Sequence, residues 1–463
     1  MKLIEVLSLK YESHIWKHFP ELTVIDAILE KRIDIFKIFE KDIIKDLKNN
    51  RLGRKDSPSV EQIVRAIIFK ESRGITYEEL ELQQYDSIIC KEFIKLNKKA
   101  FSDSMYQGYV KKINPETIKK VMIEINKLMI EFGFEDVKDV RIDATSIETN
   151  IHFPTNNSLM FDCIKSGTHV LLKLEEKHSP EYNRLVLRFI EVKKNYYDLN
   201  NIKIEEKDKD EKKRLRAELI KKLFEENLIF LQNILVDIKN SLTQDLSELS
   251  KNQINTLNNL VKQIEIIYNN AYAFQIEGKK IKVEDKIFSI YEEHTNIIVK
   301  GLRDWVFGHK VNIASGKSYL ILDYEVCRGN PADTNLFETP LKNIHEFYNK
   351  QIESVATDGC YASAANLELA NKELNIKNIV FGKVKEGMQN IFEDDTKEKF
   401  LRNFRAGAEA VISNLKRGFD LSRIDWKGFE MFESKVAWGI LGYNFRIFTK
   451  HIMATLFPKP KKV

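Results

Sequence analysis

The sequence predicts a mixed α/β domain that is preceded by a helical domain and interrupted by a long helical insertion. Three observations support this fold class. Short β-prone segments occur near residue 140 and again after residue 300. The stretch between them, about residues 158–281, is amphipathic and almost free of helix breakers. Residues 1–136 contain a series of short helical patterns joined by short turns.

Length and composition limit the class of protein. The chain has 463 residues, enough for two or three domains, and 43% of them are hydrophobic. The net charge of +5 is too small to establish a nucleic-acid partner by itself. The four cysteines show no zinc-binding spacing, so we expect a reduced, cytoplasmic protein. The charged N-terminus does not resemble a signal peptide, and no apolar run is long enough to cross a membrane, so we expect no membrane association.

Residues 1–136 are predicted to form a helical domain. Ser59 and Thr76 stand where N-caps are expected, and Gly74 marks a helix end. Short helices with exposed basic residues fit a helix-turn-helix type of DNA-binding domain. A plain helical bundle that serves dimerisation fits the composition equally well, and both interpretations stay open.

The β-prone segments build the second domain, which we divide into residues 137–157 and 301–457. Its first strand is predicted at 137–146, with Asp143 near the end. Further strands are predicted at 307–314, 318–327, 353–357 and 377–381, with a helix at 361–374. Asp358 follows the fourth strand directly. The mostly helical insertion takes residues 158–300, and residues 458–463 form a basic tail.

A helix predicted at 402–416 organises the C-terminal part. At 100° per residue, Arg402, Arg405, Glu409 and Lys416 fall within about 60° of one another, and Arg417 adjoins them. The opposite face is apolar and is expected to pack on the sheet. A single glutamate on a basic helix is usually a solvated salt-bridge partner. The position of the two aspartates favours a different role. A final apolar helix at 426–457 is also expected to pack on the sheet.

The two aspartates and the glutamate together predict a cation site. Ligands bind where strand ends meet in an α/β sheet, so Asp143, Asp358 and Glu409 are expected to converge there. Carboxylate oxygens suit Mg²⁺ or Mn²⁺, and two such ions about 4 Å apart catalyse phosphodiester displacement. The cations beside Glu409 would then hold DNA phosphates, and Lys310 is a further plausible phosphate contact. His309 is a weaker alternative for a metal or proton-transfer role.

Three segments carry a resemblance to a known family. These are RIDATSIETNIHFPTNNSLM around Asp143, VATDGCYASAANLELA around Asp358 and FRAGAEAVISNLKRGF around Glu409. In their order and spacing they resemble the three acidic blocks of bacterial insertion-sequence transposases of the DDE class. In the family's third block a tyrosine often precedes the arginine, and Arg402 stands at that position here. The resemblance covers roughly residues 55–160 and 285–450.

The resemblance implies a ribonuclease-H-like catalytic core with Asp143, Asp358 and Glu409 as metal-binding catalytic residues. It implies cutting at transposon ends and joining of the 3′-ends to target DNA, with terminal inverted repeats bound by the N-terminal domain. A homodimer acting on paired ends would be usual. Two alternatives stay open: a transposase-derived DNA-binding or regulatory protein that does not cut, and a metal-dependent nuclease that does not join. The role of the insertion is not implied, and end pairing, dimerisation and DNA clamping are all hypotheses.

Overall fold

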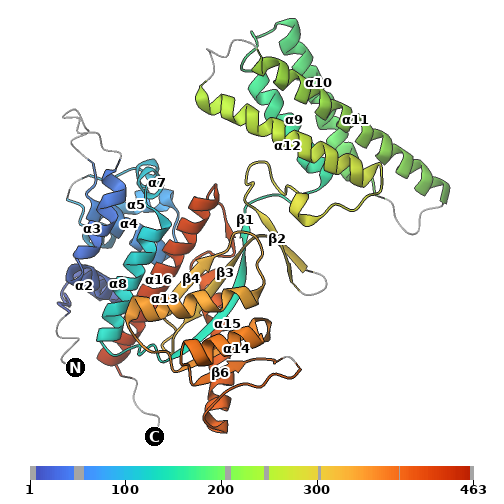
Figure 1. The fold of residues 1–463 in the computed structure, drawn as a ribbon. Helices are drawn as coiled ribbons and strands as arrows, with labels where there is room; N and C mark the ends of the chain where they lie inside the picture. The colour runs from blue at the N-terminus through green and yellow to red at the C-terminus, as the bar shows by residue number, and fades with distance from the viewer. Residues whose placement is uncertain are drawn as a thin grey trace. The chain divides into compact units, whose positions relative to one another are not determined.

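The computed structural model of the chain describes residues 7–45, 57–97, 99–203, 210–243, 250–300, 304–384 and 386–458 (Figure 1). The predicted basic tail, apart from residue 458, lies outside them. The described residues fall into two compact units. One combines residues within 1–150 and 298–463, which we call the main unit. The other comprises residues within 151–297 and is called the insertion unit. The N-terminal helices thus belong to the same compact unit as the sheet.

Within the described part of residues 7–138, eight helices precede the sheet. Their N-caps follow the sequence, because Ser59 and Thr76 both form capping boxes and Gly74 ends its helix at φ +63°. These predicted boundaries are confirmed. The helices are α1 (His14–His18), α2 (Pro20–Lys31), α3 (Asp34–Ile44), α4 (Val60–Arg73), α5 (Tyr77–Asp86), α6 (Ile88–Ile94), α7 (Asp103–Val110) and α8 (Pro115–Glu131).

A mixed sheet forms the centre of the main unit. Its strands are β1 (Asp139–Thr149), β2 (Asn296–Lys300), β3 (Asp304–Ser315), β4 (Ile321–Val326), β5 (Ser354–Thr357), β6 (Asn378–Phe381) and β7 (Arg423–Ile424). The order is β2-β3-β1-β5-β6, with β4 also pairing β3 and β7 also pairing β1. β3 runs antiparallel to β1 and β4, whereas β5 is parallel to β1 and β6 to β5. The predicted α/β class is confirmed at this level.

The structure differs from the sequence-based expectations for the strand of Asp143, for the helix after Asp358 and for two further strands. Asp143 lies in the middle of β1 rather than near its end, because β1 continues to pair with β3 and then with β7 as far as Thr149. The helix expected at 361–374 is broken into η3 (Gly359–Tyr361), α14 (Ala364–Glu368) and a π-turn, η4 (Leu369–Glu373). β2 and β7 were not predicted, and β7 has only two residues, too few to show a periodicity.

Helix α15 (Asp395–Gly418) packs over β1, β5 and β6. Its buried residues include Leu401, Phe404, Ala408 and Val411, which confirms the predicted apolar face. Leu401 and Phe404 form a small hydrophobic cluster with Ala356 of β5 and Val380 of β6. Because the apolar side of α15 faces the sheet in this way, its charged side points away from the cluster. Between β4 and β5 run η2 (Asp333–Leu336) and α13 (Glu338–Tyr348).

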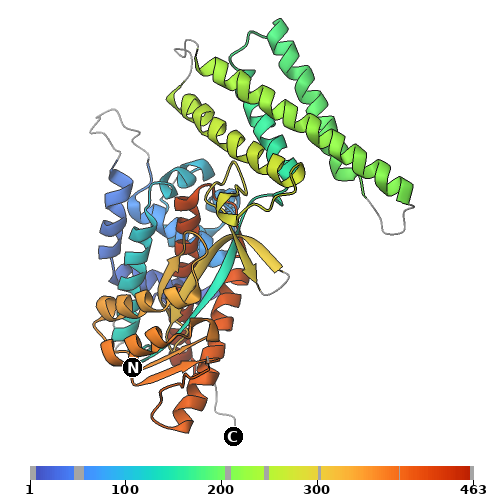
Figure 2. The same cartoon turned by 45° about the vertical axis from the view of Figure 1, so that its right-hand side comes forward.

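Helix α16 (Phe429–Leu456) packs on more than the predicted sheet. It contacts β4 and also α2, α4 and α8, and Figures 1 and 2 show it running beside the N-terminal helices. Its Asn444 amide donates to the side-chain oxygen of Asn126 and to the backbone oxygen of Ile321. These buried polar contacts tie the helical region to the sheet and make the two one unit.

A buried ion pair in this helical region gives a testable prediction. Lys435 Nζ lies 2.8 Å from Glu71 Oε2, and Lys70 Nζ lies 3.1 Å from the other oxygen. Burial would raise the pKa of Glu71, but Lys435 and Lys70 hold it below its usual value. We expect Lys435→Met to lower the free energy of unfolding by about 3 kcal/mol, because Glu71 would lose one partner in a buried position. Urea unfolding measures this. The double variant Lys435→Met/Glu71→Gln should lose less free energy of unfolding than the two single variants together. A loss equal to the sum of the two single losses would contradict the pairing.

The insertion unit is a bundle of four long helices: α9 (Asn156–Leu171), α10 (Pro180–Asn201), α11 (Asp210–Leu242) and α12 (Lys251–Gln275), followed by η1 (Val283–Asp285). Its core includes Ile164, Leu231 and Ile264. A Cβ at Gly167 of α9 would lie 2.6 Å from Ile234 Cγ2 of α11, so glycine permits this close packing. Among the described residues, no helix has the length and apolarity needed to cross a membrane.

Candidate active site

The structure places Asp143 within β1 and Asp358 directly after the neighbouring strand β5. In the parallel pairing of β1 with β5, Arg141 lies beside Ala356 and Ile142 beside Thr357. Asp143 and Asp358 are the residues that follow the last of these pairs. We call these two residues the acid pair. Asp143 is partly buried, whereas the Asp358 side chain is 52% exposed. The pair therefore has one desolvated carboxylate and one that faces solvent.

Short local contacts set the conformation of each acid. Asp143 Oδ1 accepts a hydrogen bond from the backbone N–H of Ala144 at 2.8 Å. Asp358 is the N-cap of η3, and its Oδ1 accepts from the N–H of Gly359 at 2.7 Å. A Cβ at Gly359 would lie 2.9 Å from the backbone oxygen of Lys383. Glycine is therefore needed where the chain after β5 passes the chain after β6.

The electrostatic environment of Asp143 is rich in negative charge. The pKa of Asp143 is raised to about 6, mainly by burial and to a smaller extent by the negative charges of Asp358 and Asp333. The backbone N–H of Ala144 and the guanidinium of Arg405 act in the opposite direction. A desolvated carboxylate beside other acids is stabilised by a nearby cation. Hard carboxylate oxygens in such a place fit Mg²⁺ or Mn²⁺.

Arg405 of α15 lies beside the acid pair. Its Nη1 is 4.0 Å from Asp358 Oδ1, and its side chain is 28% exposed. A Cβ at Gly382, directly after β6, would lie 3.5 Å from Arg405 Nε and 3.4 Å from Asp358 Oδ1. Gly382 thus lies against both the arginine and the aspartate. Of the predicted phosphate contacts, Arg405 is the one placed next to the acids by these distances.

Glu409 lies one turn after Arg405 on α15 and is exposed. The helix that carries it packs over both strands of the acid pair. Among the described residues, no group of three His, Cys, Asp or Glu side chains is arranged closely enough to hold a metal ion. The structure therefore places two of the three predicted ligands, Asp143 and Asp358, on neighbouring segments of the sheet. The third, Glu409, lies on the helix that packs over these segments.

Arg141 fixes α15 on the sheet. Its guanidinium is buried and donates to the backbone oxygens of Phe404 and Gly316 and to Ser315 Oγ, each at 3.0 Å. It also lies over the ring of Phe404, 4.5 Å from its centroid. A Cβ at Gly407 would lie 2.0 Å from Arg141 Nη1, so the helix can approach only with glycine there. Arg141 thereby sets the height of Arg405 and Glu409 above the strands.

The four other cations predicted to contact DNA differ in exposure and in hydrogen-bond partners. Arg402 is exposed and bonds to Glu398, and Arg417 is exposed and bonds to Ser413. Lys416 is half-buried. Lys310 is 14% exposed, and its Nζ donates to Asp333 Oδ1 at 2.8 Å and to the backbone oxygen of Pro331 at 2.7 Å. Lys310 therefore holds the loop before η2.

His309 occupies a packing position. It is fully buried, and its ring lies edge-on to Phe429 and Phe432. Its Nδ1 is 3.2 Å from the backbone oxygen of Cys327. This environment is that of a core histidine, and the weaker alternative of a metal or proton-transfer role receives no support from these contacts.

Sequence reasoning missed several residues that shape the site. Asp333 influences the pKa of Asp143, and the loop that carries it is bound by Lys310. Tyr361 donates its hydroxyl proton to Asn312 Oδ1 at 2.7 Å, and Asn312 donates to the backbone oxygen of Leu336 at 2.7 Å. One available signal was the position of Arg141, two residues before Asp143 on the same face of a strand. For the loop contacts no local signal exists.

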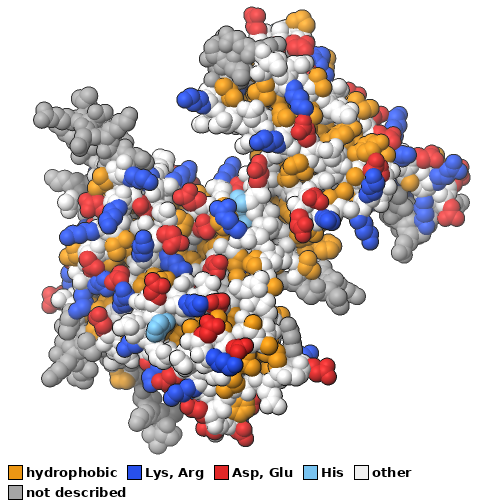
Figure 3. Space-filling view, in the orientation of Figure 1, with side chains coloured by type: hydrophobic (Ala, Val, Ile, Leu, Met, Phe, Trp, Pro, Cys, Tyr) orange, Lys and Arg blue, Asp and Glu red, His pale blue; other side chains and the backbone are white. Residues whose placement is uncertain are grey.

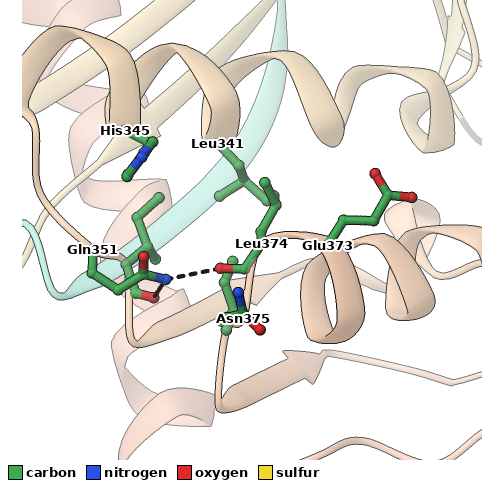
Figure 4. A pocket seen from close by; sticks show the side chains of 8 residues that line it. Leu341, His345, Gln351, Glu373, Leu374 and Asn375 are labelled. Carbon is green, nitrogen blue, oxygen red and sulfur yellow. Dashed lines mark hydrogen bonds between the residues drawn. The ribbon is translucent and has the colours of Figure 1, made fainter.

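Two hollows in the main unit differ in their relation to this site. One, of about 500 Å³, is open to solvent and is lined by Asp358 with Gly359, Cys360, Lys383, Val384 and Glu386. It borders the exposed side of the acid pair. The other, of about 180 Å³, lies by α13 and includes Leu341, His345 and Glu373 (Figure 4). There Gln351 donates to the backbone oxygen of Leu374, and no predicted site residue takes part.

Comparisons with family models, with curated proteins and with solved structures gave no match for this chain. The geometry and the sequence motifs therefore carry the functional argument.

Proposed function

We propose that the chain is a DDE-class DNA transposase of an insertion sequence with a ribonuclease-H-like core. The mixed sheet supports the fold part of this proposal. In the order β4-β3-β1-β5-β6, β3 alone runs opposite to the other strands. Asp143 lies within β1, and Asp358 directly follows β5, the parallel neighbour of β1. Ligands of open α/β sheets bind beyond the carboxyl ends of strands, which is the position of Asp358.

One observation carries the proposal: Asp143 lies on β1 and Asp358 directly follows the neighbouring parallel strand β5, with Arg405 4.0 Å from Asp358 and Glu409 one turn further along the same helix. Carboxylates alone would suggest only a cation site. An arginine beside them adds a group that binds phosphate. Both together are what cleavage of a phosphodiester requires.

The chain's own residues would divide the work as follows. Asp143, Asp358 and Glu409 would hold Mg²⁺ or Mn²⁺, in the two-ion arrangement expected for this class. Bound ions would activate water or a 3′-hydroxyl and stabilise the leaving oxygen. Arg405 would orient the scissile phosphate next to the acid pair, and Arg141 would hold α15 at the required height. Phosphoryl transfer depends mainly on such positioning and on charge stabilisation.

The remaining parts of the proposal concern partners. The helices before β1 would bind the terminal inverted repeats, and Arg402, Lys416 and Arg417 would contact DNA phosphates beside the site. Two copies would act on paired transposon ends and join them to target DNA. A cytoplasmic location, with access to the nucleoid, is part of the same proposal.

Cleavage of a labelled duplex carrying the element's own terminal repeat tests the function. We expect the wild-type protein to nick at the repeat boundary with Mg²⁺ and not with EDTA. Glu409→Gln is expected to lower the rate about 1,000-fold or more while binding of the duplex persists. Asp395→Asn is the matched control, an exposed carboxylate in the first turn of the same helix. Equal nicking by wild type and Glu409→Gln would contradict the proposal.

A second candidate function is DNA binding or regulation without cleavage. It is favoured by the exposed position of Glu409 and by the lack of a closed three-carboxylate group among the described residues. Specific binding of the duplex without metal-dependent nicking in either protein would support this candidate. Nicking without joining of the 3′-end would instead indicate a nuclease.

A further inference from the structure

The insertion unit has an exposed apolar stripe along α11. Four large hydrophobic residues of this helix are between 45% and 60% exposed: Leu215, Leu219, Ile229 and Val236, at 60%, 45%, 57% and 54%. The opposite face of α11 carries the bundle core, including Leu228, Leu231 and Ile234. Figure 3 shows hydrophobic side chains gathered on the surface of this unit. The stripe is therefore additional to the face that the bundle itself buries.

The stripe has the spacing of a coiled-coil seam. Its positions alternate between steps of four and three residues, which is the a/d pattern of a heptad repeat. They are Leu215, Leu219, Lys222, Glu226, Ile229, Asn233 and Val236. A seam of this period packs against another helix along its length, rather than against a small ligand or an irregular surface.

The charges within the stripe select the second helix. Lys222 and Glu226 lie at its centre, are 73% and 38% exposed, and are joined within the helix only by a 4.0 Å contact. If a second copy of α11 lies antiparallel, with its dyad between these positions, Lys222 meets Glu226 of the partner subunit and the reverse pair forms by symmetry. In that register Leu219 meets Ile229 of the partner subunit. The same register places Leu215 against Asn233 and Val236 against Lys212 of the partner subunit, in the outer layers of the seam. Shifting the pairing by one heptad in either direction replaces the two central lysine–glutamate pairs with contacts between a charged and an apolar residue.

We propose that α11 is a self-association surface, on which a second copy of the chain docks its own α11 antiparallel in this register. The proposal does not rest on the transposase function and concerns the protein without DNA. The neighbouring helix α10 lies alongside, since its Asn195 bonds to Glu226 and its Arg188 to Asp237. The contact of Asn195 leaves the other carboxylate oxygen of Glu226 for the partner's lysine.

Charge reversal at the centre of the stripe tests the register. We expect the full-length wild-type protein to be a dimer by analytical ultracentrifugation at micromolar concentration without DNA. Lys222→Glu and Glu226→Lys each place like charges opposite one another twice, and each should raise the dissociation constant about 100-fold. Mixing the two variants should restore association as a heterodimer, because each then supplies the charge that the other lacks.

Lys221→Glu is the matched control, a lysine on the same helix that lies off the stripe and pairs with Glu225. It should remain dimeric, and thermal unfolding followed by circular dichroism should show that all variants are folded. A monomeric wild-type protein would overturn the proposal, and so would a dimeric Lys222→Glu variant. Failure of the mixed variants to associate would overturn the antiparallel register, and with it the assignment of this surface.

Discussion

Asp143→Asn is expected to make the metal-free protein more stable while it abolishes cleavage. Burial first, and then the neighbouring acids, raise the pKa of Asp143 from its ordinary value of 3.8 to about 6. The folded state therefore binds a proton more tightly than the unfolded state. Stability falls as the pH rises from about 4 to about 6 and stays lower above that. Asparagine removes the charge and can still accept from the N–H of Ala144.

The expected gain is up to about 3 kcal/mol at pH 7, from a pKa difference of about two units at 1.36 kcal/mol each. It should disappear below about pH 3, where the wild-type carboxyl is protonated in both states. Urea unfolding in EDTA at the two pH values measures the difference. Equal stability of the two proteins at pH 7 would contradict the desolvated environment. Adding Mg²⁺ should stabilise the wild type and leave Asp143→Asn unchanged.

Arg141→Met is expected to destabilise the main unit by about 3–5 kcal/mol. The substitution leaves the backbone oxygens of Phe404 and Gly316 without their donor in a buried place, and the cost of such unpaired groups adds to that of lost packing. Because Arg141 ties β1 to α15, the same change should reduce cleavage beyond the loss expected from unfolding. The stability and cleavage rate of Arg141→Lys should fall between those of the wild type and Arg141→Met, because lysine keeps the positive charge but has fewer hydrogen-bond donors.

Urea unfolding and the cleavage rate measured well below the unfolding midpoint separate these two effects. Gly407→Ala provides an independent check of the same contact, because its Cβ would meet Arg141 Nη1 at 2.0 Å. It should lower stability in the wild type and much less in Arg141→Met, where the guanidinium is absent. Additive losses in the double variant would contradict the proposed fixing of α15 by this arginine.

Much of the fold could be predicted from local patterns. The apolar face of α15 was correctly predicted because Leu401, Phe404, Ala408 and Val411 recur at helical spacing. The N-caps at Ser59 and Thr76 could also be predicted locally, because a capping box is complete within four residues. The extent of β1 was not, because its last residues are ordered by pairing with β3 and β7, which are distant in sequence.

The candidate site divides in the same way. The convergence of Asp143 and Asp358 was anticipated because both acids were expected at strand ends, where ligands of α/β sheets bind. The pairing of β1 with β5 could not be predicted from a local pattern, because the insertion unit and three strands lie between them in the sequence. Neither could the position of Asp333, because the path of its loop is set by Lys310 of β3. The same contact gives Lys310 a structural role where the sequence suggested a phosphate contact. Charged residues on a strand show their partners only once the tertiary structure is known.

Binding of Mn²⁺ to the protein tests the central claim most directly. Electron paramagnetic resonance measures it, because the signal of the free ion decreases when the ion binds. The claim is that Asp143, Asp358 and Glu409 form one cation site, so titrations with the uncleaved terminal duplex present should compare wild type with Asp143→Asn, Asp358→Asn and Glu409→Gln. We expect the wild type and the Asp395→Asn control to bind alike and all three variants to bind much more weakly. Wild-type affinity in Glu409→Gln would show that α15 does not complete the site and would contradict the account.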